Sequence, residues 1–127
     1  MTTLLNVIER AYQGTLEEQD DQALWLVHAL RNAGAEQSVL LRGPATAYAV
    51  RGQSVAPLRI GGVATGDPPA IDRDLQRLAE KGVPVYAVRE DAEERGIAPE
   101  DALAEIQWVD RPGVARLFRE ADRILAW

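Results

Sequence analysis

Short apolar runs alternate along the chain with segments in which apolar residues recur at helical spacing. The most continuous run is residues 83–88, where apolar or weakly apolar residues follow Gly82 and charges begin at Arg89. A short run that is apolar on both alternating faces is typical of a central strand in a parallel sheet covered on both sides. Similar runs predict further strands at residues 4–9, 37–42, 106–109 and 123–127.

The longest helical pattern begins at Thr15 and runs to Asn32 or Ala33. Thr15 and Glu18 have the spacing of a capping box, in which each side chain accepts from the other residue's backbone amide. Gly34 stops the pattern. One face of this helix is apolar and is expected to pack on the sheet: it carries Leu16, Ala23, Leu24, Val27 and Leu30.

Shorter helices are predicted between the other strands. Their ranges are residues 44–50, from 67–69 to 81, 91–95 and from 110–112 to 121. Residues 53–69 have the composition of a long loop, with one short extended piece at 58–63. Strands that alternate with helices at this spacing predict βαβ units, right-handed crossovers and a parallel sheet. The expected fold is therefore a single α/β domain over residues 1–127, a three-layer sandwich with a mostly parallel five-stranded sheet of flavodoxin-like type.

Composition and charge narrow the function classes. The net charge of −6 argues against nucleic-acid binding, which needs a basic face. No apolar run approaches the roughly 20 residues of a membrane span, and residues 1–6 have no signal-peptide pattern, so we expect a cytoplasmic protein. The sequence has no cysteine and one histidine, which leaves no thiolate chemistry, and we expect no metal and no cofactor.

Stretches in order along most of the chain resemble the DsrE family of small DsrE/TusD-like sulfur-relay proteins. They are residues 6–9 with 14–21, residues 32–34 with 39–43, residues 82–88 with 95–97, and residues 121–125. The resemblance implies a DsrE-like α/β domain that assembles into homo- or hetero-oligomers, often trimers or hexamers.

Family members that carry persulfide use a cysteine just after the third core strand, eight residues before the glycine of an Arg-Gly pair. In this chain that glycine is Gly96, and counting back places the cysteine position at Val88. Valine cannot carry sulfane sulfur, and no cysteine elsewhere can replace it. The resemblance therefore implies a member without sulfurtransferase activity.

Ligand-binding residues are expected at the carboxyl ends of the parallel strands, where open α/β sheets bind their ligands. The segment after the first strand leads into a helix amino terminus, which favours an anion, although it lacks the repeated glycines of a nucleotide loop. Arginines after the second strand and in the long loop add charge, unless they are simply scattered on the surface. The candidates are Tyr12, Gly14, Thr15, Asp20, Arg42, Arg59, Val88 and Glu90.

No catalytic residue emerges from the sequence. His28 has no evident partner for acid–base work, and Ser38 and Ser54 lack a G-x-S-x-G context. The helix dipole is sufficient reason for the acidic pair Asp20 and Asp21. The acids Glu90, Asp91, Glu93 and Glu94 suit a solvated helix face. Trp25, Trp108 and Trp127 suit either core packing or a subunit interface, Trp127 especially because it lies on an edge-like strand.

The leading hypothesis is a non-catalytic, DsrE-like homo-oligomer, a trimer or hexamer, that acts as an accessory or partner-binding subunit in sulfur relay. A DsrE/TusD-like protein is the expected partner. The alternative is a small-molecule or anion-binding protein, or a cysteine-independent enzyme, that uses the strand-end crevice. A third hypothesis is a structural subunit whose purpose is assembly.

Overall fold

The computed structural model describes residues 3–11, 21–53, 59–64 and 70–127. A five-stranded sheet forms the middle layer, and every neighbouring pair of its strands is parallel. The strand order is β6-β5-β2-β1-β7. The strands are β1 (Thr3–Ile8), β2 (Glu36–Leu41), β5 (Val85–Val88), β6 (Gln107–Val109) and β7 (Arg123–Ala126). The predicted fold class is confirmed.

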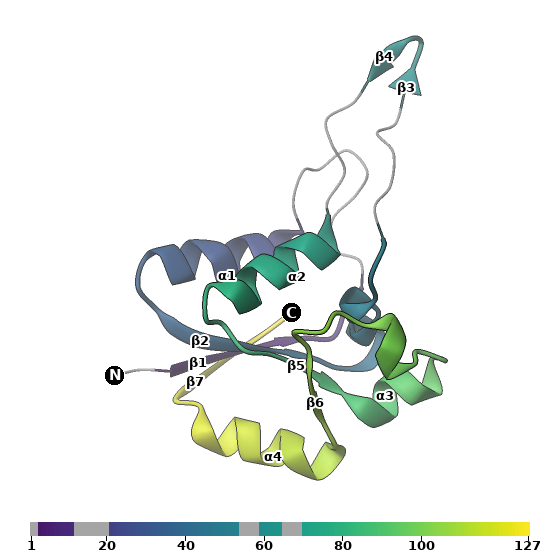
Figure 1. Cartoon of the computed structure of the whole chain (residues 1–127). Helices are drawn as coiled ribbons and strands as arrows, with labels where there is room; N and C mark the ends of the chain where they lie inside the picture. The colour runs from purple at the N-terminus through teal and green to yellow at the C-terminus, as the bar shows by residue number, and fades with distance from the viewer. Residues whose placement is uncertain (1–2, 12–20, 54–58, 65–69) are drawn as a thin grey trace.

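Helices cover both faces of the sheet (Figure 1). α1 (Gln22–Asn32) and α2 (Ile71–Glu80) lie on one face, and α4 (Arg111–Glu120) lies on the other. Three short helical segments connect the strands near their carboxyl ends. They are η1 (Gly43–Ala49), α3 (Arg89–Glu94) and η2 (Pro99–Asp101). Within the described ranges, no helix is long and apolar enough to cross a membrane.

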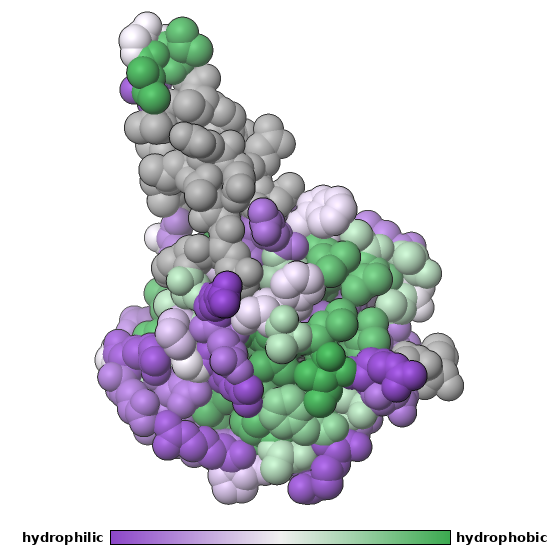
Figure 2. All heavy atoms as spheres, turned by 180° about the vertical axis from the view of Figure 1, so that it is seen from behind, coloured by the Kyte–Doolittle hydropathy of each residue, from purple (hydrophilic) through white to green (hydrophobic). Residues whose placement is uncertain are grey.

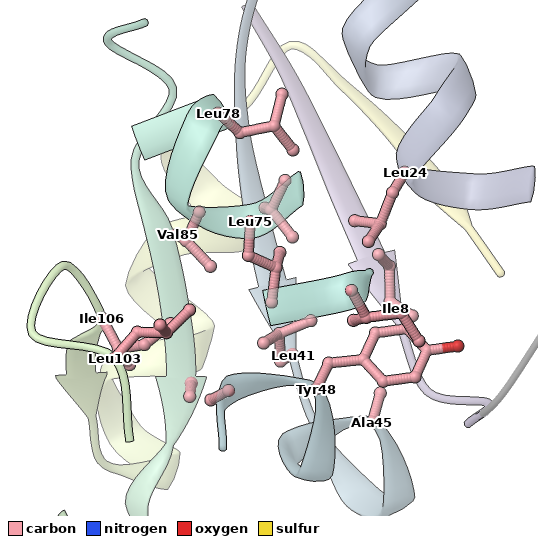
Figure 3. Packing of buried hydrophobic residues seen from close by; sticks show 14 of the residues in the cluster. Ile8, Leu24, Leu41, Ala45, Tyr48, Leu75, Leu78, Val85, Leu103 and Ile106 are labelled. Atoms are coloured by element: carbon pink, nitrogen blue, oxygen red, sulfur yellow. The ribbon is translucent and has the colours of Figure 1, made fainter. Parts of the chain in front are cut away.

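The side-chain alternation of the strands divides the core into two clusters. Ile8 and Leu41 point to the α1/α2 face, where Tyr48 and Leu75 complete the packing (Figure 3). Their strand neighbours point the other way and meet α4 through Leu117. The central strands are apolar on both faces for this reason, which is the pattern that predicted them.

Two predicted helices differ from the structure at the described residues nearest their starts, Asp21 and Ala70. α1 begins at Gln22 and is capped by Asp21, whose carboxylate accepts hydrogen bonds from the amides of Ala23 and Leu24 at 3.0 and 3.2 Å. The predicted helix is therefore not continuous through Asp21, whose backbone is extended, and its predicted start at Thr15 with the capping box lies outside the described residues. Asp21 also makes a contact outside its own helix, because its carboxylate accepts a hydrogen bond from the Tyr48 hydroxyl of η1.

α2 begins at Ile71, and Ala70, which was predicted to be helical, is its N-cap with a φ of −105° and a ψ of 75°. The predicted start at residues 67–69 lies outside the described residues. The predicted end of the helix is confirmed. Lys81 is its C-cap, and Gly82 follows with a φ of 88°, a left-handed conformation that suits glycine.

Residues 59–64 form a small antiparallel hairpin of β3 (Arg59–Ile60) and β4 (Val63–Ala64). Gly61 and Gly62 make the turn between the strands with φ values of 58° and 80°. Positive φ at both central residues matches the tight turn that suits the twist of a hairpin. The hairpin projects from the body of the molecule (Figure 1).

Candidate functional site

The carboxyl ends of β2, β5 and β6 bring a charged cluster together. Glu90 and Asp91 follow β5 directly in α3, and Arg111 follows β6 at the first turn of α4. Because the strands are parallel neighbours, residues far apart in the sequence meet at this edge of the sheet. The cluster lies where the sequence predicted the crevice.

Asp91 connects two separate loops of this edge. Its carboxylate accepts from the backbone amide of Gly43 at 2.8 Å and from the guanidinium of Arg111 at 2.9 Å. Burial opposes ionisation of the group, but the hydrogen bonds from Gly43 and Arg111 outweigh it, so the pKa of Asp91 lies below its ordinary value. Asp91 is therefore a fixed anion that holds the start of η1 against the start of α4.

Arg111 is the cation of the cluster. Its guanidinium donates to Glu94 at 2.7 Å as well as to Asp91. These hydrogen bonds raise the pKa of Arg111 further above its ordinary value, Glu94 having the larger effect. The positive charge of Arg111 is thus paired with two carboxylates. This arrangement suits a structural clamp between α3 and α4 better than an open anion site.

Glu90 has one satisfied and one unsatisfied carboxylate oxygen. Oε2 accepts from the backbone amide of Arg111 at 2.9 Å. Oε1 is buried and has no hydrogen-bond partner among the residues that the structure describes. An unpaired buried acceptor is costly, so this oxygen lowers the stability that Glu90 contributes to the cluster.

Arg42 leaves the end of β2 in another direction. Its guanidinium donates from Nε to Glu9 Oε1 at 2.7 Å and makes a second, close contact to the same oxygen through its terminal nitrogen. It also lies over the Phe118 ring of α4, 5.4 Å from the ring centroid. About a third of the side chain is exposed. Arg42 is positioned by these contacts and still reaches solvent at the strand ends.

Of the other predicted site residues, the two that the structure describes, Arg59 and Val88, do not join this cluster. Arg59 lies exposed in β3, on the hairpin that projects from the body of the molecule (Figure 1). Val88 is the last residue of β5 and is 1% exposed, packed in the cluster beneath α4. The remaining candidates lie outside the described residues: Tyr12, Gly14, Thr15 and Asp20.

The structure also gives a role to several residues considered for chemistry. Asp21 is fully buried as a helix cap and accepts from the Tyr48 hydroxyl at 2.7 Å. His28 is partly buried, and its Nε2 lies 3.3 Å from the Asp74 carbonyl oxygen of α2. In the described ranges, no group of His, Asp or Glu side chains is arranged to hold a metal ion. Trp25 is 58% exposed, whereas Trp108 and Trp127 are partly buried against the core.

The sequence did not indicate two hollows. One, of about 520 Å³, lies at the amino-terminal edge of the sheet and includes Arg31, Gln37, Lys81, Tyr86 and Glu120 in its lining. The other, of about 400 Å³, lies beyond η1 and is lined by Val50, Arg51, Gly96, Ile97 and Asp101. The first was missed because the rule for parallel sheets points to the opposite edge. The Arg111 clamp was missed because its partners come from separate elements.

Comparison with known proteins gives one family match and two informative structural matches. The model of the DsrE/DsrF-like family matches residues 11–127. The structure is similar to that of the ychN protein from E. coli, with 21% sequence identity, a TM-score of 0.80 and 100% of both chains covered. It is also similar to MTH1491 from Methanobacterium thermoautotrophicum, a protein of unknown function, with 14% identity, a TM-score of 0.62 and 100% of both chains covered. No curated protein matches the sequence.

Proposed function

The chain belongs to the DsrE/DsrF-like family, and from this premise we propose that it is a non-catalytic, oligomeric member. Its role is that of an accessory or partner-binding subunit in cytoplasmic sulfur relay, and its partner is a cysteine-bearing DsrE/TusD-like chain. The observation that carries the proposal is the residue at the position of the family's persulfide cysteine. That residue is Val88, in a chain without cysteine.

The surroundings of Val88 support this proposal. Its side chain packs with Leu40, Val109 and Leu117 in the core beneath α4. The position therefore contributes to stability through apolar burial. A residue so placed serves the packing of β5 against α4 and does not present a reactive group at the surface.

Exposed apolar side chains support the partner-binding and oligomeric parts of the proposal. Ile60 and Val63 are 66% and 70% exposed on the projecting hairpin, whose tip is hydrophobic in Figure 2. Trp25 and Ile124 are 58% and 46% exposed on the body. Single exposed apolar residues are common, but an apolar tip on a projecting hairpin is suited to insertion into another protein surface.

Native mass spectrometry of the protein purified gently from its own source tests the proposal. We expect a complex that contains several copies, with a cysteine-bearing relative bound. A strictly monomeric protein at micromolar concentration would contradict it. So would transfer of sulfur through the isolated chain.

A Val88→Cys variant distinguishes two possibilities. Either position 88 is buried and no reactive site remains, or the position is accessible and only the thiol is missing. If Val88 is buried as described, the introduced thiol should react with a thiol reagent at least about tenfold more slowly than the thiol of Arg89→Cys, because burial limits both access and thiolate formation. Residue 89 is the matched control, since it is the next residue and is exposed. Equal reaction rates would mean that the position opens to solvent and that only the sulfur-carrying group is missing.

The alternative function, binding of an anionic small molecule at the strand ends, is favoured by Arg42. Its guanidinium is fixed by Glu9 and Phe118 yet remains about a third exposed. If this version is right, Arg42→Gln should weaken binding of thiosulfate or inorganic phosphate about tenfold, as expected for loss of a charged hydrogen bond. The affinity is measured from the shift of the Gly43 amide resonance as the anion is titrated into the protein. Arg59→Gln, on the hairpin, is the control, and equal affinities of both variants would exclude Arg42 as the binding residue.

A further inference from the structure

β7 is an open edge of the sheet. It pairs with β1 on one side only, in the register that places Leu4 beside Arg123 and Asn6 beside Leu125. Trp127 continues the ladder, donating to the Val7 carbonyl at 2.9 Å while its own carbonyl accepts from Glu9 at 3.1 Å. The described residues supply no strand on the outer side of β7.

The register decides which backbone groups face outward. In a parallel ladder, alternate residues of a strand direct both their N–H and their C=O to the same neighbour. Trp127 bonds to β1, so Arg123 and Leu125 do so as well. The N–H and C=O groups of Ile124 and Ala126 consequently point to the open edge.

After the exposed Arg123 at its start, the side chains of β7 are apolar. Ile124 is 46% exposed, Ala126 is exposed and Leu125 is half-buried. β7 has one charge, at Arg123, and no lysine or proline among the residues that follow it. An open edge with exposed apolar residues is a template for pairing with another strand.

We propose that the β7 edge binds the β7 edge of a second copy of this chain, antiparallel and about a two-fold axis, so that the sheet continues across the pair. The inference rests on the proposal that the protein is an oligomer and names the surface that forms it. An edge that meets its own copy must be complementary to itself.

The sequence of β7 meets that condition. With the axis at Leu125, Ile124 lies opposite the partner's Ala126, and each of these residues both donates and accepts one backbone hydrogen bond. Leu125 lies opposite the partner's Leu125. Arg123 lies opposite the partner's Trp127, a pairing of a cation with an aromatic ring. No like charges oppose each other, and every outward backbone group of β7 gains a partner.

The geometry also restricts the assembly. A two-fold contact generates an even number of copies. It is therefore consistent with a hexamer built from two trimers, and it is inconsistent with an isolated trimer. This separates the two oligomers that the family resemblance leaves open.

Two measurements on the full chain test the contact. One is hydrogen exchange of individual amides, followed by NMR, and the other is the mass of the assembly in solution. We expect the amides of Ile124 and Ala126 to exchange at least about tenfold more slowly in the assembly than after dilution to monomer, because paired amides are protected. Ile124→Lys should abolish this protection and reduce the assembly by a factor of two in mass. Gln107→Lys is the matched control: it places the same charge at an exposed position of β6, the strand at the opposite edge of the sheet, and should leave both unchanged.

Ala126→Pro provides a second variant that preserves the monomer. It removes only an outward-facing N–H, so the pairing of β7 with β1 is retained while the contact between copies loses hydrogen bonds. Its circular dichroism and melting temperature should match those of the wild type diluted to monomer. An assembly that persists in both β7 variants, with unprotected edge amides, overturns the inference and leaves the oligomer proposal standing. A wild type that is monomeric at every concentration overturns both.

Discussion

Replacing Asp21 by alanine is expected to lower the free energy of unfolding by about 2–4 kcal/mol, the combined size of a lost helix cap and a lost buried hydrogen bond. The carboxylate caps α1 through the amides of Ala23 and Leu24 and accepts from the buried Tyr48 hydroxyl of η1. One side chain therefore fixes the start of α1 and ties it to the carboxyl end of the sheet. Chemical denaturation followed by circular dichroism measures the change.

Two variants separate the contributions of Asp21. Tyr48→Phe keeps the ring in the core and should cost about 1 kcal/mol, the typical net value of one hydrogen bond. Asp21→Asn retains a good capping residue and should cost less than the alanine variant. Because the two residues contact each other, the double variant Asp21→Ala/Tyr48→Phe should be less destabilised than the sum of the single changes. An alanine variant within about 0.5 kcal/mol of the wild type would refute the structural role.

The positions of the sheet strands could be predicted because burial on both faces leaves a local pattern. Residues 83–88 are apolar or weakly apolar in sequence, and β5 occupies the last four of them, Val85–Val88. The strand begins two residues late because Val83 donates its amide to Leu78 at the end of α2. The helix predicted from residues 110–112 to 121 is α4, whose Val114 and Leu117 pack in the core cluster on its side of the sheet.

The helix starts could not be read from the sequence in the same way. Thr15 and Asp21 are both good capping residues. The deciding contact of Asp21 is with Tyr48, which is 27 residues away. A local pattern contains no information about such a partner. The same limit applies to the Arg111 clamp, since Gly43, Asp91 and Arg111 are brought together only by the strand order.

The candidate site was predicted at the level of the sheet edge and not at the level of its residues. Arg42 and Glu90 do lie at the strand ends, but they make separate contacts with Glu9 and Arg111. Arg59 was assigned to the crevice because it follows the second strand in the chain, and the hairpin carries it elsewhere (Figure 1). Proximity in sequence does not predict proximity in space for residues of the β3–β4 hairpin, because the hairpin projects from the body of the molecule.

Asn6 is the polar residue that interrupts the apolar run of the first strand, and it is completely buried. Its Nδ2 donates to Gln37 Oε1 at 2.9 Å and to the Ser38 carbonyl at 3.1 Å, and Gln37 in turn donates to the Val27 carbonyl of α1 at 2.6 Å. Two side-chain amides thus link β1, β2 and α1. Asn6 Oδ1 has no hydrogen-bond partner among the described residues. The network depends on Asn6 as a donor.

Asn6→Asp should therefore destabilise the protein by about 3–5 kcal/mol at neutral pH, because it removes that donor and buries a charge without a partner. Burial raises the pKa of the introduced carboxyl in the folded state above its unfolded value, so the penalty is present at high pH and decreases as the pH falls toward the unfolded value near 4. Denaturation midpoints between pH 4 and pH 8 measure the trend relative to the wild type. Gln107→Glu makes the same chemical change on the exposed side of β6 and should cost little. A variant whose stability difference from the wild type is small and independent of pH would mean that Asn6 is hydrated, and would contradict its place in the core.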